Sequence, residues 1–147
     1  AVLLSHENFS GPRFARWRLR PDTAAFLKFL PCTLTFEFAG KSILLTHGTP
    51  DEWMAYLFPE SDPAEYHKII EQHAVDVVIM GHTHVPMHVR VNDSHVINPG
   101  SVHRNREGYS GSQTCGIFDL ETMRLQIMNI HTGEPLSYET KTISEAP

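Results

Sequence analysis

The spacing of hydrophobic and polar residues along this chain predicts an α/β protein with several short strands. Residues 33–38 alternate between polar and apolar side chains, which is typical of a strand with one buried face. The apolar run 41–46 follows directly after Ala39 and Gly40, so the two segments are expected to form a β-hairpin. The run 75–80 is almost entirely apolar and rich in valine, as in a strand buried on both faces of a sheet.

Two further hairpins and three helices complete the expected elements. The hairpins pair residues 87–91 with 95–97 and residues 114–120 with 123–130. The expected helices cover residues 21–30, 51–58 and 62–74. The last of them opens with Asp-Pro-Ala-Glu, a pattern that caps a helix N-terminus, and its His67 and His73 are expected at the surface. The polar residues 131–147 are expected to form a loosely held tail.

Composition and charge narrow the class of protein. The length of 147 residues suffices for one domain with its own core, so a single domain is expected over residues 1–147. A formal net charge of −5 argues against a protein that binds nucleic acid by attracting phosphates. No apolar stretch reaches the roughly 18 residues that a membrane span needs. Cys32 and Cys115 lie far apart in the sequence, and two buried, reduced thiols in a cytoplasmic protein are expected.

Three histidines stand where predicted strands end. His82 and His84 belong to the segment Gly-His-Thr-His at 81–84, directly after the buried run, and His47 follows the run 41–46. Ligands bind at the carboxyl ends of strands in open α/β sheets, and neutral imidazoles are common ligands of divalent transition metals. If the two strands run parallel, the three histidines could converge on one metal site. The alternatives are solvent-exposed loop histidines at 82 and 84, and a simple turn residue at 47.

One other segment could also be interpreted as a metal-binding pattern, but the evidence for it is weaker. Asp93, Ser94 and His95 have the Asp-x-His spacing that many binuclear metal sites use. They precede a predicted strand, whereas metal ligands of such sites follow one. We therefore favour a hairpin turn for this segment.

Three segments resemble blocks of the calcineurin-like metallophosphoesterase superfamily, in particular its small bacterial and archaeal phosphodiesterase branch. They are residues 43–48, 77–86 and 97–102, the last followed by Arg106 and Gly108. The resemblance runs from about residue 21 to residue 130. It implies a four-layer αββα sandwich with two metal ions at the carboxyl ends of the central strands.

The resemblance also implies a chemistry and a ligand set. His47 and His82 would bind one metal ion and His84 the other, with Mn expected first and Fe, Ni or Zn as alternatives. The reaction would be hydrolysis of a small-molecule phosphoester by a two-metal mechanism. Arg104 and Arg106 are candidates for phosphate contacts.

The chain departs from the family pattern before His47. The family's Asp-x-His, Gly-Asp and Gly-Asn-His blocks supply the bridging aspartate and the histidine that protonates the leaving group, and none has a recognisable match here. Residues 5–8 are either a degenerate remnant of the third block or, as we favour, lie beyond it. We therefore expect the C-terminal part of a longer metallophosphoesterase without its N-terminal strands, and name no catalytic residue. The three histidines alone could hold a single Zn²⁺ or Ni²⁺ with water.

Two functions from different classes follow. The first is a metal-dependent phosphodiesterase or phosphatase. The second is a non-catalytic scaffold of the same fold that binds protein partners, which the missing carboxylate ligands favour. Exposed sheet edges would also make association between copies of the chain favourable.

Overall fold

The computed structural model describes residues 20–103 and 113–144, and the chain divides into two compact units, 1–32 and 33–147. In the first unit, the helix α1 (Pro21–Phe29) forms where the sequence predicts it, with proline in its first turn. Proline is preorganised for that position, and the helix ends before Pro31. None of its residues is buried in the described part of the chain. The single domain predicted over residues 1–147 stays a prediction.

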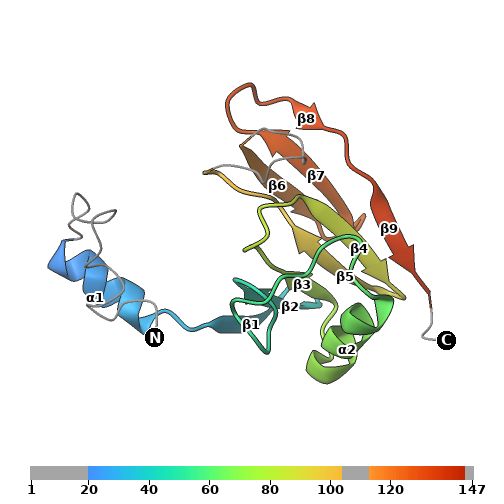
Figure 1. The fold of residues 1–147 in the computed structure, drawn as a ribbon, viewed down its shortest axis with the longest axis horizontal. Coiled ribbons are helices and arrows are strands. Elements are labelled where there is room, and N and C mark those ends of the chain that lie inside the picture. The colour runs from blue at the N-terminus through green and yellow to red at the C-terminus, as the bar shows by residue number, and fades with distance from the viewer. Residues whose placement is uncertain (1–19, 104–112, 145–147) are drawn as a thin grey trace. The chain divides into compact units, whose positions relative to one another are not determined.

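The second unit is built on a six-stranded mixed sheet in the order β1-β2-β3-β5-β4-β9 (Figure 1). Its strands are β1 (Thr33–Phe38), β2 (Lys41–Thr46), β3 (Val77–Ile79), β4 (Met87–Val91), β5 (Ser94–Asn98) and β9 (Thr140–Ile143). The three central strands β2, β3 and β5 run parallel, whereas β1 and β4 pair with them antiparallel. The hairpins β1–β2 and β4–β5 form as the sequence predicts from its alternating apolar residues and its turn residues.

A smaller sheet covers one face of the six-stranded sheet. It comprises β6 (Thr114–Asp119), β7 (Arg124–Asn129) and β8 (Pro135–Leu136). Leu125 and Ile127 of β7 pack against Ile43, Val77 and Ile97 of the larger sheet in one buried cluster. The β6–β7 hairpin is the last one that the sequence predicts.

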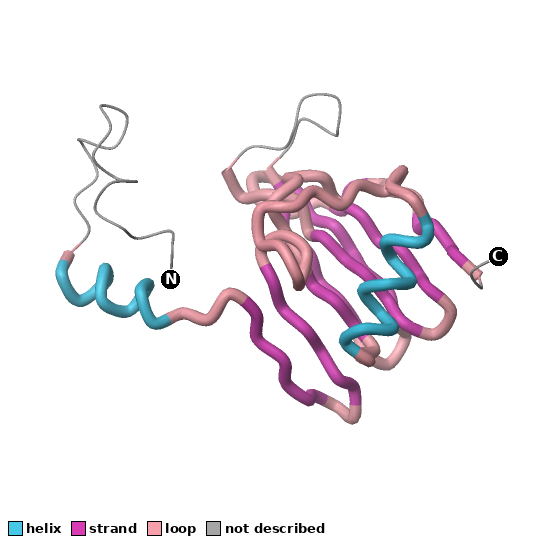
Figure 2. The backbone as a smooth tube through the Cα atoms, turned by 60° about the horizontal axis from the view of Figure 1, so that its bottom comes forward, coloured by secondary structure: helices cyan, strands magenta, loops and turns pink. Residues whose placement is uncertain are grey.

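The helix α2 (Pro63–His73) lies across the other face of the six-stranded sheet (Figure 2). The Asp62 side chain accepts a hydrogen bond from the Ala64 backbone N–H (2.9 Å) and caps the helix as predicted. Tyr66 and Ile69 enter the core together with strand residues such as Leu44, Val78 and Val89. Helix, large sheet and small sheet thus form successive layers of an α/β fold, as predicted.

Burial on α2 corrects one expectation. His67, predicted at the surface, is only 6% exposed, because it lies beside Ile70 at the edge of the helix face that packs on the core. Its Nε2 atom is buried and has no hydrogen-bond partner among the described residues. His73 is half-buried, with its Nε2 atom 3.4 Å from Asp51 Oδ1.

Residues 51–58 do not form the predicted helix. The Glu52 carbonyl accepts hydrogen bonds from the backbone N–H groups of Thr49 (3.1 Å) and Ala55 (2.9 Å). The Thr49 hydroxyl donates to the same carbonyl (3.1 Å). These contacts close tight turns, and they occupy the carbonyl that would accept the next i+4 bond of a helix.

The polar tail is more ordered than expected. Strand β9 pairs with β4 over four residues, and Ile143 is 6% exposed within the core. Backbone pairing at the sheet edge therefore compensates for the lack of apolar side chains in this segment. The expectation of buried thiols is also wrong, since Cys32 and Cys115 are both exposed. No helix among the described residues is long and apolar enough to cross a membrane.

Candidate metal centre

Two of the predicted ligands meet at the carboxyl ends of neighbouring parallel strands. Strand β2 leads into His47 and β3 leads into the loop that carries His82. The His82 Nδ1 and His47 Nε2 atoms lie 3.0 Å apart, so one ring N–H donates to the other ring nitrogen. The Gly81 backbone N–H donates to the His47 carbonyl (2.9 Å) and holds the two strand ends together.

The loop that carries the histidine pair has an unusual backbone. His82 (φ 63°) and His84 (φ 58°) both adopt the left-handed conformation. A residue other than glycine is disfavoured there by about 1 kcal/mol or more, and such conformations gather at functional sites. Thr83 between them is buried, and its hydroxyl accepts a hydrogen bond from the Val85 backbone N–H (3.1 Å). The backbone strain is therefore held by a specific local network.

Asn98 at the end of β5 fixes this loop from the neighbouring strand. Its side chain is fully buried, and Nδ2 donates to the Gly81 carbonyl (2.8 Å) and the Thr83 hydroxyl (3.0 Å). Its Oδ1 atom accepts from the Gly100 backbone N–H (2.9 Å). The sequence places Asn98 in a family block, but its role in holding the histidine loop emerges only from these contacts.

The electrostatics favour neutral imidazoles. Burial lowers the pKa of His47 below its ordinary value, and the nearby His82 and His84 lower it further. A neutral imidazole is the form that binds a metal ion. The His82 Nε2 atom is buried and lacks a hydrogen-bond partner among the described residues. An orphaned ring nitrogen beside a neutral imidazole fits a metal site.

His84 lies close enough to influence His47 but does not complete a ligand group. Within the described ranges, no set of three or more His, Cys, Asp or Glu side chains is arranged to hold a metal ion. The structure therefore brings His47 and His82 into contact, and His84 lies close enough to lower the pKa of His47. The three-histidine ligand set stays a prediction.

An aromatic side chain packs on His82 and was not anticipated from the sequence. The ring of Tyr56 stacks on the ring of His82, with centroids 4.4 Å apart, and also on Phe58 at 5.8 Å. The loop that brings Tyr56 here runs close to Gly48, where a Cβ atom would lie 2.3 Å from the Trp53 carbonyl oxygen. Glycine directly after a strand-end histidine is the signal that could have indicated this close approach.

The remaining sequence candidates are resolved more simply. Residues 92 and 93 form the turn of the β4–β5 hairpin, as favoured above, and the Asp93 carboxylate lies 3.4 Å from Arg90 Nη2. His95 faces His88 instead of a metal site. Arg104, Arg106 and the segment 5–8 lie outside the described residues.

Comparison with known proteins supports a common fold and family. A model described as the calcineurin-like phosphoesterase superfamily domain matches residues 19–123. An uncharacterized protein from Methanocaldococcus jannaschii is 25% identical over 140 residues, covering 82% of this chain and 54% of that protein. The chain thus spans about half the length of this curated relative.

Two solved structures share the fold at lower identity. A metallophosphoesterase from Sphaerobacter thermophilus is 18% identical with a TM-score of 0.61, over 82% of this chain and 54% of that one. Vacuolar protein sorting 29 from Cryptosporidium parvum is 17% identical with a TM-score of 0.53, over 72% of this chain and 54% of that one. At these identities the likeness concerns the fold alone.

Proposed function

Because this chain belongs to the calcineurin-like phosphoesterase superfamily, we propose that it carries the histidine ligands of a metal-dependent phosphoesterase. The observation that supports this most directly is the 3.0 Å contact between the ring nitrogens of His47 and His82. His82 makes this contact from a loop in which its backbone is left-handed. The superfamily generally uses divalent metal ions. We assign His47 and His82 to one ion and His84 to a second, with Mn first and Fe, Ni or Zn as alternatives.

The residues of this chain would act mainly by positioning. Asn98 and Gly81 hold the loop so that His82 stays beside His47. The lowered pKa of His47 keeps its imidazole neutral near pH 7. Divalent ions bound in such a centre would supply a hydroxide near neutral pH and would neutralise phosphate oxygens. The chain spans about half of its curated relative, so the two-ion activity on a small-molecule phosphoester is proposed for the whole protein.

The test is hydrolysis of an aryl phosphodiester and an aryl phosphomonoester by the full-length protein with Mn²⁺. We expect the His82→Ala variant to lose at least about 100-fold in activity, as expected when a metal ligand is removed. His131→Ala serves as a matched control, because His131 is exposed and outside this site. Chelation should abolish activity and Mn²⁺ should restore it. Turnover that survives both chelation and His82→Ala would contradict the proposal.

A second candidate function is a scaffold that binds protein partners, and one surface supports it. The face of the β1–β2 hairpin carries Leu34, Phe36, Phe38 and Leu45, which are between 39% and 64% exposed. Contiguous exposed apolar patches of this kind mark interaction surfaces. Under this alternative, no metal supports turnover. Phe38→Asp would then abolish a complex with another protein or a second copy, measured by light scattering, while His82→Ala would leave it intact.

A further inference from the structure

A cavity opens at the ends of these parallel strands that lie opposite the candidate metal centre. Strands β2 and β5 begin at Lys41 and Ser94, at the end of the sheet away from His47 and His82. The cavity has a volume of about 870 Å³ and lies between the two sheets, where the β6–β7 turn approaches β4, β5 and β9. This volume falls in the range of small-molecule sites, roughly 300–1,000 Å³.

The charge of this cavity opposes that of the whole chain. Its described lining contains Lys41, Arg90 and Arg124, and Asp93 is the one carboxylate among those lining residues. The chain as a whole carries a formal net charge of −5. The hydroxyl groups of Thr122, Thr140 and Thr142 add neutral donors to the same wall.

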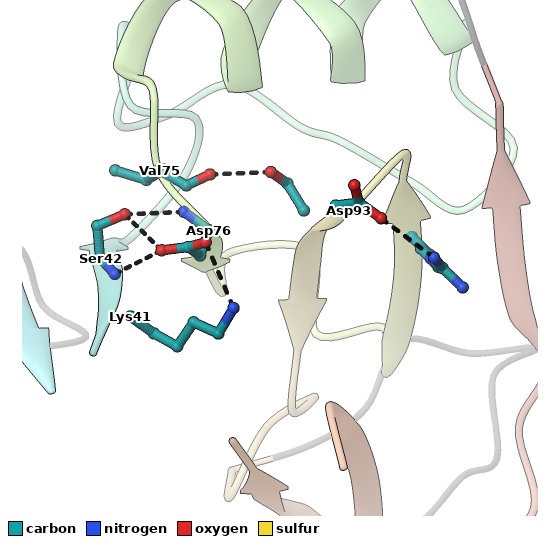
Figure 3. Close-up of polar contacts among 7 residues, drawn as sticks. Lys41, Ser42, Val75, Asp76 and Asp93 are labelled. Atoms are coloured by element: carbon teal, nitrogen blue, oxygen red, sulfur yellow. Dashed lines mark hydrogen bonds and ion pairs between the residues drawn. The ribbon is translucent and has the colours of Figure 1, made fainter. Parts of the chain in front are cut away.

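The cations are only weakly engaged by protein carboxylates. Lys41 Nζ lies 3.7 Å from Asp76, whose carboxylate already accepts hydrogen bonds from Ser42 at 2.7 and 2.9 Å (Figure 3). Arg90 Nε donates to the Asn92 carbonyl (2.8 Å), which orients its guanidinium, and the Asp93 carboxylate lies 3.4 Å from Nη2. No ion pair involves Arg124 in the part of the chain that the structure describes.

A buried histidine pair lines the cavity and shows that these charges converge. His88 Nε2 and His95 Nδ1 lie 2.8 Å apart. Burial lowers the pKa of His95, and the positive charges of Arg90 and Lys41 lower it further, while Asp93 acts in the opposite direction. Both cations therefore influence the same point of the wall. Burial lowers the pKa of His88 as well, to about 4, so this histidine pair adds no positive charge to the cavity near pH 7.

We propose that this cavity, lined by Lys41, Arg90 and Arg124, binds a phosphorylated small molecule of about nucleotide size. Three cations with hydroxyl donors suit a ligand with several phosphate oxygens, because charge-assisted hydrogen bonds to phosphate are strong. The cavity lies at the other end of the strands from the loop carrying His82, so it is a binding site separate from the candidate metal centre. The proposal does not depend on the proposed hydrolase activity.

The experiment is a calorimetric titration of the metal-free protein in EDTA with ADP, pyrophosphate and adenosine. We expect ADP and pyrophosphate to bind with a Kd below about 1 mM, more weakly as salt rises, and adenosine not to bind. Arg124→Gln should weaken binding about tenfold, as loss of one charged hydrogen-bonding group does. Lys68→Gln, which removes a positive charge from an exposed side chain of α2, is the matched control and should bind as the wild type does.

Nuclear magnetic resonance gives a second readout at the same site. A bound anion counteracts Arg90 and Lys41, so saturation with pyrophosphate should raise the pKa of His95. The other charged or titratable residues that line the cavity are Arg124, Asp93, His88 and Tyr138. Arg90→Gln offers a second variant that should weaken binding. Absence of binding, equal binding of adenosine, or loss of binding in His82→Ala instead of Arg124→Gln would each overturn the proposal. Failure of phosphoester hydrolysis alone would leave it standing.

Discussion

Two pairs of histidines are in contact in this protein, and they are built in different ways. His82 Nδ1 lies 3.0 Å from His47 Nε2, and His88 Nε2 lies 2.8 Å from His95 Nδ1. The first pair stands on loops at the carboxyl ends of β2 and β3. The second pair is formed by regular strand residues of β4 and β5, which lie diagonally across an antiparallel ladder.

The comparison shows that a close contact between imidazoles does not identify a metal site by itself. His88 and His95 are 4% and 6% exposed, and their facing nitrogens satisfy each other. The loop pair instead has a left-handed backbone at His82 and an orphaned, buried Nε2 atom. Backbone strain and an unsatisfied ring nitrogen therefore distinguish the candidate metal centre from a structural pair.

We expect the largest loss of stability from a variant that disturbs the loop pair, His47 and His82, and leaves the strand pair, His88 and His95, in place. Asn98→Ala removes a buried side chain that donates to Gly81 and Thr83 and accepts from Gly100. We expect the free energy of unfolding to fall by about 3 kcal/mol, because buried polar partners lose their hydrogen bonds. Urea denaturation measures the loss, and the ring resonances of His88 and His95 should stay in place. A loss below about 1 kcal/mol would mean that the loop carrying His82 keeps its conformation without the hydrogen bonds of Asn98.

Acid should act on the strand pair in particular. Burial lowers the pKa of His88 from the ordinary value of 6.5 to about 4 in the folded protein. Its contribution to stability is therefore complete above pH 6.5 and is lost as pH falls toward 4. We expect the free energy of unfolding to drop by about 2 kcal/mol between pH 7 and 4.5 from this pair.

The control for the acid effect removes the pair. In the double variant His88→Leu/His95→Leu, the fall in stability between pH 7 and 4.5, measured by urea denaturation, should be smaller by about that amount. His131→Leu, which changes an exposed histidine, should keep the wild-type dependence. An unchanged pH slope in the double variant would show that other groups cause the acid sensitivity.

Two glycine variants test how tightly the backbone packs around the histidine pair of the loops, with smaller expected losses of stability. A Cβ atom at Gly48 would lie 2.3 Å from the Trp53 carbonyl oxygen, whereas one at Gly81 would meet the His47 carbonyl at 3.6 Å. Gly48→Ala should therefore displace the loop carrying Tyr56 and destabilise the protein by about 2 kcal/mol. Gly81→Ala should change stability by less than about 1 kcal/mol. Thermal denaturation of both variants tests this, and equal effects would contradict the close packing at Gly48.

Much of the secondary structure could be predicted from the sequence, because its signals are local. Alternation over residues 33–38 and the apolar run 41–46 predicted the first hairpin. The Asp-Pro pattern at residues 62 and 63 predicted the start of α2. The histidines at positions 47, 82 and 84 were recognised as candidates because each follows a predicted strand. Each of these inferences depends on residues that are neighbours along the chain.

The tertiary structure decided which of those residues meet. The contact between His47 and His82 requires β2 and β3 to be parallel and in the register that pairs Leu45 with Ile79. A hydrophobic pattern indicates which residues face a core, but it does not determine which strands are neighbours. Residues 51–58 form turns instead of the predicted helix, because Thr49 donates hydrogen bonds to the Glu52 carbonyl.

The roles of buried polar residues depended in the same way on partners distant in sequence. Asn98 reaches the histidine loop across 17 residues, and His88 meets His95 only through the register of β4 and β5. His67 is buried by packing that its position on a helix does not reveal. The sequence alone thus determined the family, the main elements and the candidate ligands. The fold determined their geometry, because distances between residues far apart in the chain are set by strand order and register.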